Sequence, residues 1–192
     1  MPIEIEAKLK VDSLQEVKHK LAELGAEFIA EQRQVDCYFD DGDMTLTKAD
    51  RGFRLRRQTA DGNERFFLTY KGARGKSKFK QREEIEIEIK DADSTEKLLS
   101  ALGYEKILVF EKKRVVWQLG ECEVALDELP LLGFFVEIEG PDRERIADIQ
   151  RSLGLSDLPH IAESYAVLME KKLKELGIEQ REVFLEDSEQ KQ

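Results

Sequence analysis

Apolar and polar residues alternate regularly over the first stretch of the chain, from Ile3 to Val11. Successive side chains of a β-strand point to opposite faces, so Glu4, Glu6 and Lys8 share one face and the apolar residues share the other. The same alternation returns further along with paired acids and with paired arginines. We therefore predict a sheet in which several strands carry an entirely charged face.

Eight stretches have strand patterns, and short glycine turns at Asp61-Gly62 and Gly120 join two pairs of them into hairpins. The predicted strands are 3–11, 26–40, 53–58, 65–71, 80–90, 107–119, 121–127 and 133–139. Helical spacing with capping residues and terminal glycines predicts helices at 13–25, 93–103, 141–154 and 159–176. Because strands and helices do not alternate regularly, the sheet is expected to be mainly antiparallel.

A sheet with one face in water explains any single alternating strand, but it explains the whole set poorly. A wet face usually mixes charges with Thr, Ser and Gln, whereas charged residues here line one face of strand after strand. An open sheet of this size would also leave edges to protect, and closure into a barrel removes them. The fold class we predict is α+β: a closed eight-stranded antiparallel barrel with its charged faces inside and helices packed against the apolar outside.

Charges inside a barrel are costly unless they are paired or bound to a ligand. Carboxylate pairs suit hard divalent cations, and arginine pairs suit phosphate oxygens. A lining of both signs therefore favours a metal–phosphate site. An apolar-ligand carrier fits badly, because such barrels have apolar linings.

The chain has 192 residues and a net charge of −10, with 41% hydrophobic and 38% charged residues. This acidic balance argues against a nucleic-acid partner, and no apolar run is long enough to cross a membrane. The N-terminus has the pattern of a strand and not of a signal peptide, so a cytoplasmic location is expected. We predict one domain at 1–177 and an acidic, mobile tail at 178–192.

The charged strands resemble the CYTH family, whose members are also called triphosphate tunnel metalloenzymes. The opening Glu4-Ile5-Glu6-Ala7-Lys8 matches the family's ExExK signature, and an ordered series of further matches extends to about Lys172. These matches are Arg54-Leu55-Arg56, Leu68-Thr69-Tyr70-Lys71, Arg82-Glu83-Glu84-Ile85-Glu86, Lys112-Lys113-Arg114, Asp127, the strand Gly133–Glu139, and Ser164-Tyr165.

The resemblance implies a tunnel that binds a triphosphate with Mg²⁺ or Mn²⁺. The chain is most similar to class IV adenylyl cyclases, which implies conversion of ATP to cyclic AMP and pyrophosphate. A triphosphatase acting on inorganic or thiamine triphosphate is the first alternative. The second is a non-catalytic module that binds a phosphorylated ligand. A homodimer is compatible with the resemblance, although no residue establishes one.

The resemblance also implies roles for individual residues. The metal ligands would be Glu4, Glu6, Asp127, Glu137 and Glu139. The phosphate-binding residues would be Lys8, Arg54, Arg56, Lys71, Arg82, Lys112 and Arg114. Glu4, Glu6, Lys8, Lys112 and Arg114 would be catalytic. Two alternatives stay open: Asp127 is a turn residue, or Arg82, Glu84 and Glu86 only pair with neighbouring charges.

Overall fold

Nine strands and five helices make up the computed structural model, which describes residues 3–73 and 80–186 and, for residues 3, 4 and 80–82, the backbone only. Residues 74–79 and 187–192 lie outside the described residues. The strands are β1 (Ile3–Val11), β2 (Glu27–Asp41), β3 (Gly52–Ala60), β4 (Asn63–Lys71), β5 (Lys80–Ile89), β6 (Tyr104–Leu119), β7 (Cys122–Leu129), β8 (Gly133–Glu139) and β9 (Glu182–Val183). The helices are α1 (Leu14–Glu23), α2 (Thr45–Lys48), α3 (Ala92–Ala101), α4 (Arg143–Ser152) and α5 (Tyr165–Leu176).

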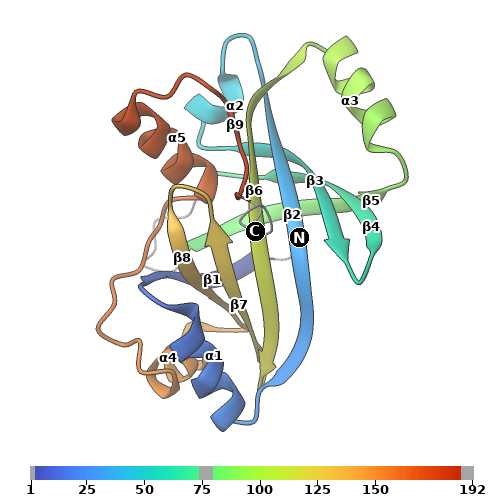
Figure 1. Ribbon diagram of the computed structural model, residues 1–192. Coiled ribbons are helices and arrows are strands. Elements are labelled where there is room, and N and C mark those ends of the chain that lie inside the picture. Colours follow the sequence, from blue (N-terminus) through green and yellow to red (C-terminus); the bar gives the residue numbers. More distant parts are fainter. Residues whose placement is uncertain (1–2, 74–79, 187–192) are drawn as a thin grey trace, which may run out of the picture.

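Eight strands form one antiparallel barrel, in the order β2-β3-β4-β5-β1-β8-β7-β6 (Figure 1). The ring closes because the last strand, β6, also pairs with β2, from Glu27↔Gln118 to Asp41↔Tyr104. Two register shifts interrupt this long pairing, and such bulges let a strand bend around a barrel. The predicted closed antiparallel barrel is confirmed.

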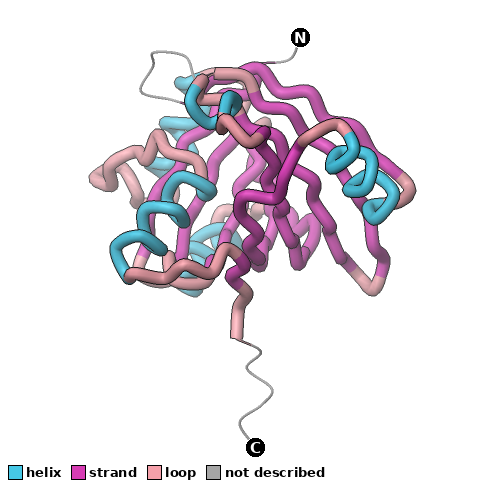
Figure 2. The backbone as a smooth tube through the Cα atoms, turned by 90° about the horizontal axis from the view of Figure 1, so that it is seen from above, coloured by secondary structure: helices cyan, strands magenta, loops and turns pink. Residues whose placement is uncertain are grey.

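The main hydrophobic core lies outside the barrel, between its wall and the helices α1 and α4. Outward-facing Val124, Val136 and Ile138 pack against Leu21 and Ile146 from the two helices, and all five side chains are buried. Each fully buried aliphatic side chain stabilises the fold by about 1.5–3 kcal/mol. Figure 2 shows, from above, helices lying beside the curved wall of strands. The expected outward apolar face is thus present over β1, β7 and β8.

One part of β6 departs from this arrangement. Leu108 and Phe110 share the inward face with Lys112, and helix α5 packs against them through Met169 and Leu173. Helix α5 therefore closes one end of the barrel and does not simply cover its outside. The predicted start of this helix at Pro159 is wrong, since it begins at Tyr165.

The six residues before α5, 159–164, connect the helix to β1 and are not helical. The backbone N–H of Ile161 donates to the carbonyl oxygen of Lys8 at 2.8 Å, which ties this segment to β1. Ser164 then caps the helix, because its hydroxyl accepts from the Val167 N–H. Long-range contacts of this kind have no signature in the helical periodicity.

Helix α2, which the sequence pattern did not predict, is a four-residue turn between β2 and β3. The fully buried carboxylate of Asp40 accepts from the backbone N–H groups of Leu46 and Thr47 at 3.0 and 2.8 Å. Met44 and Asp50, on either side of the turn, have left-handed φ angles of 55°. A buried side chain, and not helix propensity, holds this turn in place.

The first part of the acidic tail differs from the expectation of a mobile segment. Strand β9 pairs in parallel with Val109 and Phe110 of β6, along the edge that β7 does not reach. Beyond it, the N–H of Leu185 donates at 3.0 Å to the buried carboxylate of Glu111. Two residues of pairing are too short for a pattern of alternation to reveal.

Removal of residues 178–192 is expected to lower the free energy of unfolding by about 1–3 kcal/mol, because the truncation exposes the β6 edge and takes a partner from Glu111. Urea denaturation of the full and truncated chains measures the difference. Equal stability of the two chains would show that 1–177 is complete without the tail. No helix in the described ranges 3–73 and 80–186 has the length and apolar character needed to cross a membrane.

Candidate active site

The inward charged faces of the strands surround one cavity of about 270 Å³. Eleven of the residues predicted from the sequence line it: Glu6, Lys8, Arg54, Arg56, Lys71, Glu84, Glu86, Lys112, Arg114, Glu137 and Glu139. Glu4 and Arg82 are cross-strand partners in the backbone pairing of β1 with β5, but their side chains lie outside the described part of the chain. These eleven side chains come from six strands: β1, β3, β4, β5, β6 and β8.

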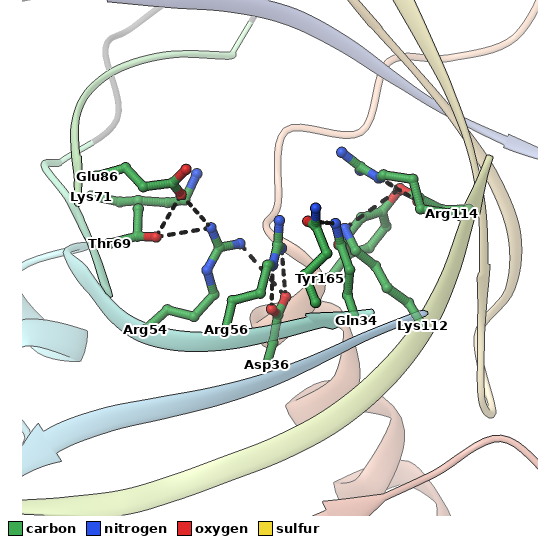
Figure 3. A network of polar contacts seen from close by, with 12 residues as sticks. Gln34, Asp36, Arg54, Arg56, Thr69, Lys71, Glu86, Lys112, Arg114 and Tyr165 are labelled. Atoms are coloured by element: carbon green, nitrogen blue, oxygen red, sulfur yellow. Dashed lines mark hydrogen bonds and ion pairs between the residues drawn. The ribbon is translucent and has the colours of Figure 1, made fainter. Parts of the chain in front are cut away.

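Two arginines on β3 are held by one buried carboxylate that the sequence analysis did not single out. Arg56 binds Asp36 in a bidentate manner, with Nε–Oδ1 at 2.6 Å and Nη2–Oδ2 at 2.8 Å (Figure 3). Arg54 Nη1 lies 3.6 Å from the same carboxylate. Burial alone would raise the pKa of Asp36, but Arg56 and Arg54 outweigh burial and hold it well below its usual range. Asp36 therefore fixes the direction of the Arg56 guanidinium, and it is one of the carboxylates beside Arg54.

The neighbouring part of the wall, on β4 and β5, pairs its charges locally. Arg54 Nη2 donates to Thr69 Oγ1 at 3.1 Å, and the Thr69 hydroxyl donates to Glu86 Oε2 at 2.8 Å. Lys71 forms an ion pair with Glu84. Glu84 and Glu86 thus contact neighbouring basic or polar groups in the structure. Arg54 Nε is buried and has no hydrogen-bond partner among the described residues.

Asp127 is a fully buried residue within β7, so it is not a turn residue. Arg114 binds it in a bidentate manner, at 2.7 and 2.5 Å, and also forms an ion pair with Glu137. The hydroxyl of Tyr165, at the start of α5, donates to Asp127 Oδ2 at 2.8 Å. Asp127 is not among the residues that line the cavity, and both of its oxygens are engaged by these groups.

Two lysines are buried in the middle of this network. Lys8 Nζ lies 3.2 Å from Glu137 Oε1, donates to the Glu163 carbonyl at 3.0 Å and sits 4.0 Å from the centre of the Tyr165 ring. Lys112 Nζ lies 3.8 Å from Asp127 Oδ2. Burial, helped by repulsion from Arg114, lowers the pKa of Lys112 to about 7. Its charge is therefore sensitive to whatever anion enters the cavity.

The acids gather where β1 meets β8. The pairing places Glu6 opposite Glu139 and Lys8 opposite Glu137. Burial, together with the neighbouring carboxylates of Glu123 and Glu6, raises the pKa of Glu139 to about 6. Carboxylate oxygens that repel one another in a cavity are a donor set that suits Mg²⁺ or Mn²⁺. Among the side chains described, which exclude Glu4, no three acids, histidines or cysteines already converge closely enough to hold an ion.

Comparison with known proteins agrees with this geometry. The family model described as the CYTH domain matches residues 2–165. The chain belongs to the CYTH family. A Methanocaldococcus jannaschii protein, provisionally named adenylate cyclase MJ0240, is 33% identical to it over 175 residues, which cover 86% of this chain and 98% of that protein.

Solved structures confirm the fold. The PH1819 protein of Pyrococcus horikoshii has a TM-score of 0.77 and 30% identity, and the match covers 88% of this CYTH chain and 99% of that one. HpAC1 of Hippeastrum, described as having a dominant triphosphatase activity, has a TM-score of 0.70 at 17% identity and covers 88% of this chain and 95% of that one. The second likeness concerns the fold alone.

Sequence reasoning found the lining but missed the residues that orient it. Asp36 shares the inward face of β2 with Tyr38, so strand parity could have marked it. Tyr165 was part of the family resemblance, but its hydrogen bond to Asp127 depends on where α5 packs. The parity of a strand is visible in a sequence, whereas the approach of a distant helix is not.

Proposed function

We propose that this CYTH protein is a metal-dependent enzyme that converts ATP to cyclic AMP and pyrophosphate inside the barrel. The supporting observation is the charge of the cavity lining, which has seven lysines and arginines against eight aspartates and glutamates. A bare triphosphate would meet as many acids as bases there. A triphosphate with bound divalent cations satisfies both sets of charges, because the cations face the acids and the phosphate oxygens face the bases.

The basic side chains would bind the phosphates. Arg54 and Arg56 enter the cavity side by side from β3, held by Asp36, and Lys71 faces them from β4. Lys8, Lys112 and Arg114 approach from β1 and β6. Planar guanidinium groups bind two phosphate oxygens at once, so the two arginines fix the orientation of the chain of phosphates. Arg82 would extend this set from β5.

The carboxylates Glu4, Glu6, Glu137 and Glu139 would hold Mg²⁺ or Mn²⁺. When bound, the metal ion supplies Lewis-acid stabilisation of the charge on the reacting and leaving oxygens. Asp127, which the resemblance assigns to the metal, already contacts Arg114 and Tyr165, so we assign it a positioning role. Asp127 would hold the Arg114 guanidinium and the Tyr165 hydroxyl in fixed positions while negative charge develops on the departing pyrophosphate.

The runner-up function is hydrolysis of a triphosphate. The same basic side chains would bind the phosphates, but a water molecule would attack the phosphorus atom in place of the ribose 3′-oxygen. HpAC1, which shares the fold, is described as chiefly a triphosphatase, and this gives the alternative its weight. A module that only binds its ligand is the third candidate.

Product analysis separates the three. The chain is incubated with ATP, and separately with inorganic triphosphate, in the presence of Mg²⁺ or Mn²⁺. Cyclic AMP with pyrophosphate supports the cyclase. ADP with phosphate, or rapid hydrolysis of inorganic triphosphate, supports the triphosphatase. Tight binding of either compound without turnover contradicts both enzymes.

Binding of the triphosphate is expected to take up about one proton at pH 8. Lys112, whose pKa is about 7, is mostly neutral there, and a phosphate group beside it raises that pKa so that it becomes charged. Glu139, with a pKa of about 6, is already ionised and contributes little. Titration calorimetry in two buffers of different ionisation enthalpy measures the uptake.

The matched control is Lys112→Arg, which stays charged at pH 8 and should bind without uptake. The uptake by the natural chain should fall as the pH drops below 6, because Lys112 is then protonated before binding. An uptake in the Lys112→Arg variant equal to that of the natural chain would show that another group carries the proton.

A further inference from the structure

One end of the cavity has a chemistry that phosphate binding does not require. Beyond the arginines and lysines, its walls are Ile107 of β6 and Ala166 and Val167 of α5, all apolar. Two acids also line the cavity: Asp50, just after α2, and Glu170 on α5, and these two helices lie at the same end of the barrel (Figure 1). Arg51, next to Asp50, also lines the cavity, so two acids stand here against one base. A phosphate group would gain nothing from the apolar walls and would meet a net negative charge.

Both sides of this end are fixed before any ligand arrives. On one side, the backbone N–H of Arg51 donates to the Leu46 carbonyl oxygen at 2.8 Å. The buried Asp40 carboxylate fixes the α2 turn by accepting from two of its backbone N–H groups. On the other side, helix α5 is anchored by its buried face through Tyr165 and Met169. Rigid walls of this kind can select a ligand by shape.

Besides the buried face that packs on β6, helix α5 has another face that borders the cavity. Ala166, Val167 and Glu170 line it, and residues three and four apart lie on the same side of a helix. The Tyr38 ring, which also lines the cavity, stacks on Phe110 with centroids 5.6 Å apart and planes at 19°. An aromatic ring, aliphatic side chains and hydrogen-bond acceptors thus surround one space.

We infer that this end binds the base of a nucleoside triphosphate, with Glu170 and Asp50 accepting hydrogen bonds from an amino group or ring N–H of the base. The inference rests on the proposed function, since it requires the phosphates to lie against Arg54 and Arg56. A flat ring packs against aliphatic and aromatic walls, and carboxylates accept N–H groups but repel anions. Glu170 and Asp50 would then determine which base is accepted.

The half-buried position of Glu170 agrees with this role. Burial raises the pKa of Glu170, and the positive charge of Arg181 acts in the opposite direction. The carboxylate has therefore already lost part of its contact with water in the absence of a ligand. A hydrogen bond from a neutral N–H group to a desolvated carboxylate is stronger than one in water. Loss of such a bond typically costs about tenfold or more in affinity.

The test compares three compounds by titration calorimetry in Mg²⁺: ATP, purine riboside triphosphate, which lacks the amino group, and inorganic triphosphate. The natural chain should bind ATP about tenfold more tightly than purine riboside triphosphate. Glu170→Ala should remove that preference. Val167→Trp, which fills the space for the base, should weaken both nucleotides by at least about tenfold and leave inorganic triphosphate within about twofold.

Glu175→Ala, on the exposed side of the same helix, is the control and should behave like the natural chain. If Glu170→Ala keeps the preference for ATP, or if Val167→Trp weakens inorganic triphosphate as much as ATP, the base does not lie here. In either case the natural chain still binds inorganic triphosphate, so the proposed triphosphate site stands. If the natural chain binds none of the three compounds, the proposed function itself is wrong.

Discussion

Replacement of both Glu137 and Glu139 by glutamine is expected to lower kcat/KM for the triphosphate substrate by at least about 10²-fold. The two side chains lie on one face of β8 and line the cavity beside Glu6. Glutamine keeps their size and a carbonyl oxygen but removes two negative charges, which a hard divalent cation requires. Steady-state rates over a range of Mg²⁺ and Mn²⁺ concentrations measure the effect.

The dependence on metal separates a ligand role from a structural one. If the carboxylates hold the ion, the variant should need much more metal to reach half of its own maximum rate. Glu16→Gln with Glu23→Gln, on the exposed surface of α1, removes the same charge and should keep the natural rate. Activity of the Glu137/Glu139 variant within a few-fold of the natural chain would mean that these carboxylates do not bind the metal.

Asp36→Asn is expected to lower the free energy of unfolding by about 3–5 kcal/mol, which is typical when one partner of a buried ion pair is removed. Asp36 is 1% exposed, and the variant leaves the guanidinium of Arg56 without its bidentate partner. Arg54 loses one of its three neighbouring carboxylates and keeps Glu84 and Glu86. Activity should fall as well, because Arg56 would lose the partner that holds its direction. Urea denaturation and triphosphate binding measure the two effects.

The pH dependence of the free energy of unfolding tests whether the loss of stability in Asp36→Asn comes from the lost ion pair. The pKa of Asp36 is lowered in the folded protein, so its contribution is complete above the unfolded value of about 3.9 and is lost as the pH falls toward the folded value. The difference between the natural chain and Asp36→Asn should therefore be constant from pH 5 to 8 and shrink below pH 4. Asp157→Asn, an exposed substitution, should show no such difference. A constant difference down to pH 3 would contradict the ion-pair explanation.

The barrel and most of its lining could be predicted because strand parity is a local property of the sequence. Once Lys112 and Arg114 are placed inside, every second residue of β6 back to Leu108 follows them, and the register shift at Ile107 ends the rule. The same rule put Leu108 and Phe110 inside, where only the contact with α5 makes apolar residues stable. Parity tells which residues point inward, but not which of them meet water, a ligand or another helix.

Features that depend on single long-range contacts could not be predicted. The α2 turn is held by Asp40, the start of α5 is delayed by the contact of Ile161 with β1, and β9 rests on two residues of pairing. None of these contacts has a periodic pattern. Asp127 illustrates the same point, because its place in β7 was within reach of the sequence and its engagement by Arg114 and Tyr165 was not.

In the proposed complex, acids and bases from distant strands jointly hold a triphosphate bridged by metal ions inside one barrel. A crystal structure of the chain with Mn²⁺ and a non-hydrolysable ATP analogue tests it directly through the anomalous signal of manganese. We predict a manganese peak between Glu137, Glu139 and the phosphates, with Arg54 and Arg56 on the opposite side of the phosphates. Phosphates bound outside the barrel, or manganese away from these carboxylates, would contradict it.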